Sequence, residues 1–166
     1  FKTKIILRLP GEHNIMNALA AISICSELGI SFNDIKQGLN YFSGVQRRFD
    51  IKYKLNNGTI LIDDYAHHPV EVNSVLDALK SGWDNRIISI FQPHLFSRTQ
   101  DFHNEFAIAL LKSDIIIITD IYAAREKPIN NITSQIIVND LLNLGHKKVK
   151  YIPDKAKISD YIKKNY

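Results

Sequence analysis

Three short apolar runs constrain the fold of this chain more than any other feature. They span residues 59–62, 86–91 and 114–119, and none of them alternates between apolar and polar side chains. Uniformly apolar strands are typical of sheets that helices cover on both faces. A polar loop and a segment of helical periodicity follow each run. The alternation predicts βαβ units, and with them an α/β fold: a three-layer sandwich with a mostly parallel sheet.

The first part of the chain has a different pattern. Residues 1–9 have the composition of a strand, and the next apolar periodicity predicts a helix that begins at His13 or Asn14. Asn14 is the expected N-cap, because Asn side chains accept hydrogen bonds from the free N–H groups of a first helical turn. Ser31, followed by Asp34, predicts the start of a second helix.

A polar and basic connector, residues 43–49, follows these helices. The pattern changes there from a helical pair to alternating strands and helices, which predicts a boundary between two domains, residues 1–46 and 47–166. Arg47 and Arg48 lie in the connector, and the simplest interpretation of this pair is two solvated charges on a linker.

Asn-Asn-Gly at 56–58 separates two strand candidates, residues 50–55 and 59–62. Asn-Gly is the commonest short hairpin signal, because both central positions of the tightest hairpin turn need a positive φ. The sequence therefore predicts a hairpin here. A short strand at 149–152 and a helix from about residue 154 to 164 are expected further along the chain.

The composition is that of a soluble globular protein, with 45% hydrophobic and 23% charged residues. The net charge of +4 comes with late lysines that have no interleaved aromatic residues, so we interpret them as a solvated face and expect no nucleic-acid partner. No apolar run approaches the roughly 20 residues of a membrane span. A single cysteine, Cys25, excludes a disulfide within the chain and fits a cytoplasmic protein.

Polar side chains follow the three apolar runs. Asp63 and Asp64, with the next five residues, come after the first run, and His94 and Arg98 come after the second. Ligands of open α/β sheets bind outside the carboxyl ends of the strands. We therefore expect three polar strand ends side by side on one edge of the sheet. An arginine fork there can grip a carboxylate or a phosphate, although a surface arginine on a capped helix has the same sequence pattern.

The segment after the first run allows three interpretations. His67 and His68 with the preceding carboxylates have the chemistry of metal ligands, but adjacent side chains rarely converge on one ion, and we expect no metal site. Alternatively, Asp64 accepts hydrogen bonds from ligand hydroxyls while Tyr65 and His67 orient a polar ligand. A structural role is also open, in which His68 or an Asp only caps the following helix. The chain has no glycine-rich phosphate loop of its own.

Five motifs in one order resemble the Mur ligases, over nearly the whole chain. They are Gly-Glu-His-Asn-Ile-Met-Asn at 11–17, Gly-Val-Gln-Arg-Arg-Phe at 44–49, Asp-Asp-Tyr-Ala-His-His-Pro at 63–69, Phe-Gln-Pro-His-Leu-Phe-Ser-Arg-Thr at 91–99 and Asp-Ile-Tyr-Ala-Ala-Arg-Glu-Lys-Pro at 120–128. The resemblance implies an ATP-dependent, amide-bond-forming ligase. It further implies that L-alanine is joined to UDP-N-acetylmuramate through an acyl phosphate, in the cytoplasmic synthesis of peptidoglycan precursors.

The resemblance also implies roles for individual residues. Those expected at ATP are His13, Asn14 and Asn17 near the adenine, Arg48 at the phosphates and Asp64 at the ribose hydroxyls. Those expected at the acceptor carboxylate and the incoming alanine are Tyr65, His67, His94 and Arg98, with His67, His94 and Arg98 as the catalytic group. Many relatives carry arginine where this chain has Leu95, so recognition of the amino acid is expected to depend more on Arg98.

In the family's three-domain plan, residues 1–46 would be the C-terminal part of the central ATP-binding domain. Residues 47–166 would be the Rossmann-like C-terminal domain, cut before its end. ATP and Mg²⁺ are the implied cofactors, with the main Mg²⁺ ligands outside this chain, and the segment alone is expected to be inactive. Two alternatives stay open: a related ligase that recycles murein peptide, and a non-catalytic nucleotide-binding α/β module.

Overall fold

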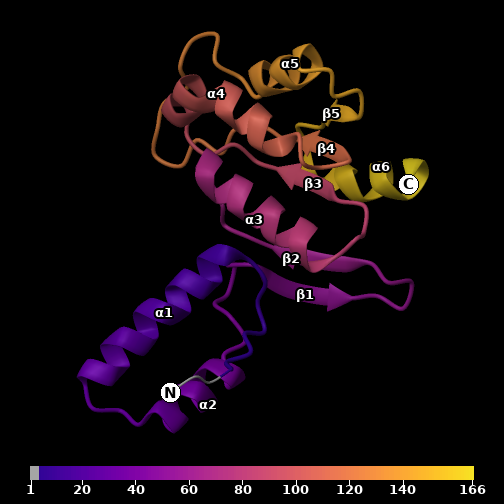
Figure 1. Cartoon of the computed structure of the whole chain (residues 1–166). Coiled ribbons are helices and arrows are strands. Elements are labelled where there is room, and N and C mark those ends of the chain that lie inside the picture. Colours follow the sequence, from indigo (N-terminus) through magenta and orange to yellow (C-terminus); the bar gives the residue numbers. More distant parts are fainter. Residues whose placement is uncertain (1–3) are drawn as a thin grey trace. The chain divides into compact units, whose positions relative to one another are not determined.

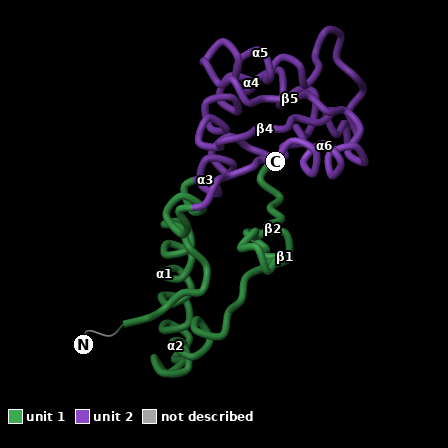
Figure 2. Tube along the Cα trace, turned by 90° about the vertical axis from the view of Figure 1, so that its right-hand side faces the viewer, with its two compact units in different colours: residues 1–66, 77–84 green, residues 67–76, 85–166 purple. Residues whose placement is uncertain are grey.

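The computed structural model describes residues 4–166, and the chain divides into two compact units (Figure 2). The first unit comprises the described residues up to Ala66 together with Asp77–Asp84. The second comprises His67–Leu76 and Asn85–Tyr166. Helix α3, Pro69–Gly82, begins in the second unit and ends in the first. Pro69 occupies its first position, where a missing N–H costs no hydrogen bond.

The first unit begins with two helices, α1 (Glu12–Glu27) and α2 (Phe32–Tyr41). The prediction of Asn14 as N-cap is wrong. Gly11 takes that position with a φ of 104°, and the Asn14 side chain instead donates to the carbonyl of Pro10 at 2.7 Å. Ser31 caps α2 as expected, since its hydroxyl accepts from the N–H of Asp34 at 3.2 Å.

The strand predicted over residues 1–9 is absent from residues 4–9, and the rest of that prediction lies outside the described residues. The hairpin is confirmed: β1 (Asp50–Lys54) pairs antiparallel with β2 (Ile60–Asp63). Of its three loop residues, all described, only Gly58 has a positive φ, at 84°. The loop is therefore wider than the two-residue turn, and Leu55 N–H donates across it to the Thr59 carbonyl at 2.8 Å.

The second unit contains a parallel sheet in the order β3 (Ile88–Phe91), β4 (Ile115–Ile118), β5 (Val149–Tyr151). The expectation that the strand before Asp63 joins this sheet is wrong, because β2 forms a separate two-stranded sheet with β1. A three-residue loop holds β1 beside β2, and closing so short a loop costs little chain entropy. Of the three predicted strand ends, only those of β3 and β4 are paired neighbours.

Helices cover both faces of the parallel sheet, which confirms the three-layer arrangement (Figure 1). On one face the ring of Phe91 lies 5.0 Å from that of Phe106 in α4 (Phe96–Leu110), which packs beside α5 (Gln135–Asn143). Ile117 of β4 points to the opposite face, because it is adjacent in its strand to the residue paired with Phe91. There it packs with Ile158 of α6 (Ile158–Asn165). A short 3₁₀ turn, Lys155–Lys157, precedes α6.

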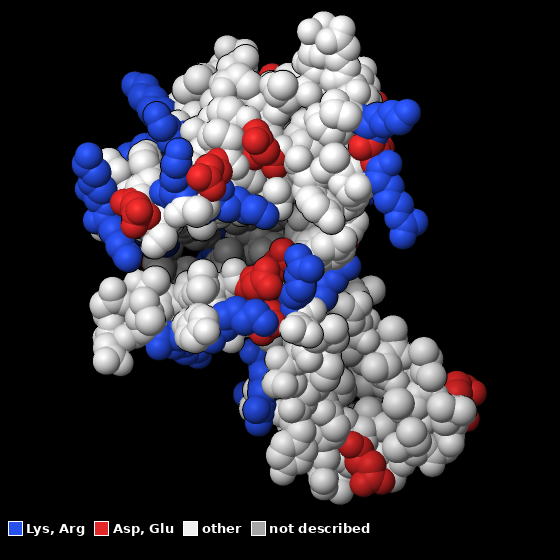
Figure 3. Space-filling model, turned by 180° about the vertical axis from the view of Figure 1, so that it is seen from behind, with Lys and Arg blue, Asp and Glu red and all other residues white. Residues whose placement is uncertain are grey.

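The four isoleucines of β4 are completely buried, with exposures of 0 to 1%. This burial accounts for the unbroken apolar run in the sequence. Among residues 4–166, no helix is both long enough and apolar enough to cross a membrane. Where Lys and Arg side chains gather on the face shown in Figure 3 they are interspersed with Asp and Glu, and part of that face has only Asp and Glu as charged groups.

Candidate functional site

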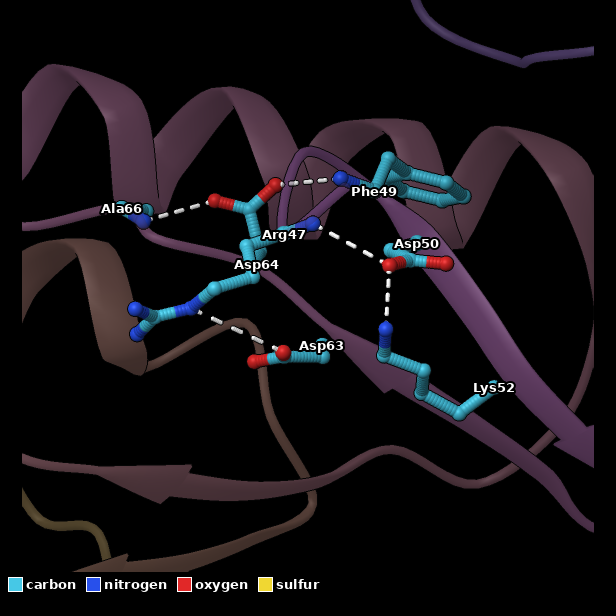
Figure 4. Close-up of polar contacts among 7 residues, drawn as sticks. All are labelled: Arg47, Phe49, Asp50, Lys52, Asp63, Asp64 and Ala66. Atoms are coloured by element: carbon cyan, nitrogen blue, oxygen red, sulfur yellow. Dashed lines mark hydrogen bonds and ion pairs between the residues drawn. The ribbon is translucent and has the colours of Figure 1, made fainter. Parts of the chain in front are cut away.

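The connector and the segment after β2 are tied together within the first unit (Figure 4). One oxygen of the Asp64 carboxylate accepts from Phe49 N–H at 2.7 Å, and the other accepts from Ala66 N–H at 2.7 Å. The N–H of Tyr65 donates to the carbonyl of Arg47 at 2.8 Å. Arg47 and Phe49 have positive φ values of 58° and 48°, conformations that non-glycine residues hold only where surrounding contacts impose them.

Both arginines of the connector lie over one aromatic ring. The guanidinium carbons of Arg47 and Arg48 are 4.7 and 5.9 Å from the centroid of the Tyr65 ring. Arg47 also approaches Asp63, with 3.8 Å between Nε and Oδ2, and its backbone N–H donates to Asp50 at 3.1 Å. Both residues remain exposed, as the interpretation of solvated linker charges expects, and they also share the Tyr65 ring as a neighbour. Cation–π contacts hold both guanidinium groups at the face of Tyr65.

The remaining candidates for ATP lie at the start of α1, also in the first unit. His13 and Asn14 are half-buried, whereas Asn17 is exposed. A Cβ at Gly11 would lie 2.8 Å from the His13 ring and 2.9 Å from Ala78 Cβ. Only glycine therefore fits at this start of the helix, where the backbone lies close to His13.

The second unit brings together the three candidates for catalysis. His94 and Arg98 are half-buried, and Nη1 of Arg98 lies 3.2 Å from Nδ1 of His94. The centroid of the His67 ring is 5.7 Å from that of His94. The centroid of the Tyr122 ring, from the loop after β4, is 5.5 Å from that of His94. The fourth candidate, Tyr65, belongs to the first unit.

Burial lowers the pKa of His94, and the positive charge of Arg98 lowers it further, with a smaller contribution from the neighbouring His67. His94 is therefore neutral at pH 7. A guanidinium group can only donate, so Nδ1 of His94 accepts from Arg98 and Nε2 carries the ring proton. The pair presents a positive fork and a neutral imidazole N–H, a combination suited to holding a carboxylate.

Glu71 holds His67 in place, and sequence reasoning missed it. Its carboxylate accepts from the backbone N–H groups of His67 and His68 at 2.9 and 3.2 Å, and it lies 3.3 Å from Nδ1 of His67. The signal was a Glu three residues after His68, the spacing of a capping box. His68 has the structural role that was left open, since its Nδ1 accepts from Val70 N–H at 3.4 Å.

Glu126 is a second residue that sequence reasoning left without a role. Its carboxylate accepts from Ser97 twice, from the backbone N–H at 3.0 Å and from the hydroxyl at 2.5 Å. These hydrogen bonds, led by that of the Ser97 hydroxyl, lower the pKa of Glu126, with a smaller contribution from the charge of Arg98. The only signal in the sequence was a carboxylate in the loop after the neighbouring strand.

A further polar cluster lies at the ends of the parallel strands. The hydroxyl of Tyr151 donates to Asp120, and burial together with this contact raises the pKa of Tyr151 to about 12. Gln92 donates to the Asp120 carbonyl at 3.2 Å and accepts from Lys155 at 3.2 Å. Among residues 4–166, no group of three or more His, Cys, Asp or Glu side chains is arranged to hold a metal ion.

Comparison with known proteins shows which family the chain resembles. The family model described as "Mur ligase, glutamate ligase domain" matches residues 47–165. The UDP-N-acetylmuramate--L-alanine ligase of Salinibacter ruber is 45% identical over 151 residues, which are 90% of this chain and 32% of that protein. The ligase of the same name from Chlorobium chlorochromatii is 46% identical over 149 residues, 88% of this chain and 32% of that protein.

Among solved structures, the UDP-N-acetylmuramate-alanine ligase of Thermotoga maritima superimposes with a TM-score of 0.80 at 30% identity, over 96% of this chain and 33% of that one. A murein peptide ligase from Psychrobacter arcticus has the same fold, with a TM-score of 0.62 at 23% identity, over 95% of this chain and 32% of that one. The chain thus spans about a third of the length of these relatives. The family match covers most of its residues, and the chain belongs to the Mur ligase family.

Proposed function

We propose that this chain is the C-terminal part of an ATP-dependent ligase that joins L-alanine to UDP-N-acetylmuramate. The observation that carries the proposal is the convergence of His67, His94 and Arg98 in the second unit. The names of relatives 45% and 46% identical to the chain support this substrate pair. We place the enzyme in the cytoplasm, because its lone cysteine fits a reducing compartment.

In this proposal Arg98 binds the carboxylate of L-alanine. The paired N–H groups of a guanidinium match the two oxygens of a carboxylate, and half-burial of the arginine strengthens the contact. Neutral His94 adds a hydrogen bond through Nε2–H, and His67, oriented by Glu71, lies beside the acceptor carboxylate. Charge that develops on the reacting carboxyl group is stabilised by such prearranged donors.

The first unit would bind ATP. Arg48 has a delocalised positive charge suited to phosphate oxygens, and the face of Tyr65 supports its side chain. Each oxygen of Asp64 accepts one backbone N–H and retains a lone pair for a ribose hydroxyl. His13, Asn14 and Asn17 supply ring and amide groups for the adenine. These residues have the chemistry to contact ATP, and the main ligands of Mg²⁺ would lie outside this chain, as the family resemblance implies.

The domain division follows from the same proposal. We assign residues 1–46 to the central ATP-binding domain and residues 47–166 to the C-terminal domain. The positive φ values of Arg47 and Phe49 mark a change of backbone direction where the second assignment begins. The missing acceptor-sugar domain and phosphate loop would lie elsewhere in the complete protein, so this chain alone should form no product.

The test uses the complete ligase with ATP, UDP-N-acetylmuramate and labelled L-alanine. We expect a labelled UDP-linked product and stoichiometric phosphate release, and neither from the 166-residue chain alone. Transfer of an intact tripeptide in place of L-alanine would identify the murein peptide recycling ligase. ATP binding without transfer of either L-alanine or the tripeptide would indicate the non-catalytic nucleotide-binding module.

A further inference from the structure

Two loops of the second unit are joined at the carboxyl ends of β3 and β4. The N–H of Leu95 donates to the carbonyl of Tyr122 at 2.9 Å, and the N–H of Tyr122 donates to the carbonyl of Pro93 at 2.8 Å. His94 and Tyr122 form an isolated parallel bridge. The first loop, residues 92–95, carries His94 and leads into the first turn of α4, which carries Arg98. The positions of His94 and Arg98 therefore depend on the contacts made by the second loop, residues 120–126.

The backbone of both loops is in an unfavourable conformation. Leu95 has a φ of 72° and Ala124 a φ of 51°, values in the left-handed region that non-glycine residues seldom adopt. Such conformations persist only where neighbouring contacts enforce them, and they concentrate at functional sites. Leu95 is also the N-cap of α4, and its side chain has no group that could accept from the first turn of the helix.

Glu126 supplies the acceptor that Leu95 lacks. Its carboxylate takes the N–H of Ser97, one of the N–H groups that a helix leaves without an internal partner, and also the Ser97 hydroxyl. A negative charge at this end of the helix is favourable for the helix dipole as well. The contact crosses 29 positions of sequence and links the loop after β4 to the first turn of α4.

We propose that Glu126 is a positioning residue for amino-acid binding, which fixes the first turn of α4 so that Arg98 and His94 face the substrate carboxylate together. Ser97, which Glu126 contacts, directly precedes Arg98 in the sequence and so connects Glu126 to Arg98. A further consequence is that Glu126 already fills the anion-binding start of α4, so a substrate carboxylate is directed to the guanidinium of Arg98 and not to the helix end. This inference rests on the proposed function for the identity of the amino acid.

Glu126→Ala tests the proposal in the complete ligase, with Asp101→Ala as the matched control. Asp101 is an exposed carboxylate on the same helix, so the control removes the same charge without touching Ser97. Two readouts are needed: hydrogen exchange of a peptide covering residues 95–99, and KM and kcat for L-alanine. The exchange readout does not depend on any activity.

We expect Glu126→Ala to accelerate exchange in that peptide about tenfold and to raise KM for L-alanine about tenfold, with kcat within about threefold of wild type. Ser97→Ala, which removes only the hydroxyl contact, should change exchange and KM in the same direction by about threefold. It replaces Glu126→Ala as the deciding variant if the latter does not fold. Asp101→Ala should resemble wild type in both readouts.

Unchanged exchange in the deciding variant would overturn the positioning role, whatever happens to activity. Faster exchange with an unchanged KM for L-alanine would overturn it as well, since the contact would then be only structural. A wild-type ligase that does not use L-alanine would refute the proposed function instead. In that case the exchange readout still decides whether Glu126 holds the first turn of α4.

Discussion

Nη1 of Arg98 lies 3.2 Å from Nδ1 of His94, so the guanidinium group and the imidazole form one donor set. One residue comes from the first turn of α4 and the other from the loop before it. This pairing joins a permanent positive charge to a ring that burial keeps neutral. Four predictions follow from it and from the tied connector of the first unit.

Arg98→Ala in the complete ligase should lower kcat/KM for L-alanine, because a carboxylate would lose its charged partner. The drop should correspond to a loss of about 2 to 5 kcal/mol in transition-state stabilisation. Arg98→Lys should also be poor, since an ammonium group cannot reproduce the planar fork. Steady-state kinetics at saturating ATP measures both. An Arg98→Ala ratio within about tenfold of wild type would mean that another residue, such as Arg125, binds the carboxylate.

His94 should titrate below its ordinary pKa of about 6.5, since burial and then the charge of Arg98 disfavour its protonated form. A lowered pKa in the folded state means that the unfolded chain binds the proton more readily. The stability that His94 contributes is therefore complete above about pH 6.5 and is lost as the pH falls below it. NMR titration of the ring protons measures the midpoint. A midpoint at or above 6.5, or one unmoved by Arg98→Ala, would contradict this account.

Asp64→Ala should destabilise the first unit by about 1 to 3 kcal/mol, because the N–H groups of Phe49 and Ala66 would lose a charged acceptor. Urea unfolding followed by the fluorescence of Trp83 is suitable, since this ring stacks on Phe49 at 6.0 Å. Asp63→Ala is the control, as its exposed contact with Arg47 at 3.8 Å should contribute less than about 1 kcal/mol. Equal effects of the two changes would refute the role of Asp64 as a tie.

Limited proteolysis should cut first within residues 41–50, where the connector is mostly exposed and two adjacent arginines offer trypsin sites. The expected products end at Arg47 or Arg48 and are identified by mass spectrometry. The double variant Arg47→Gln, Arg48→Gln should lose this early cut. Early cleavage elsewhere, with the connector intact, would place the domain boundary outside residues 41–50.

Much of the fold was predictable because its signals are local. Unbroken apolar runs indicated the buried strands β3 and β4, and turn and cap residues such as Gly58 and Ser31 marked the hairpin and the start of α2. His94 and Arg98 were predictable as neighbours for the same reason, since both come shortly after β3, one in the loop and one in the first turn of α4. Each of these features depends on residues within one element or its immediate flanks.

Sheet membership and the partners of charged groups were decided by the tertiary structure. An apolar run does not encode which strand edge it will pair with, so β2 was expected in the parallel sheet although it pairs with β1. The acceptor for the first turn of α4 is Glu126, brought from another loop because Leu95 cannot cap. Residues far apart in sequence meet only once the strands are paired, and hydrophobic periodicity carries no information about those meetings.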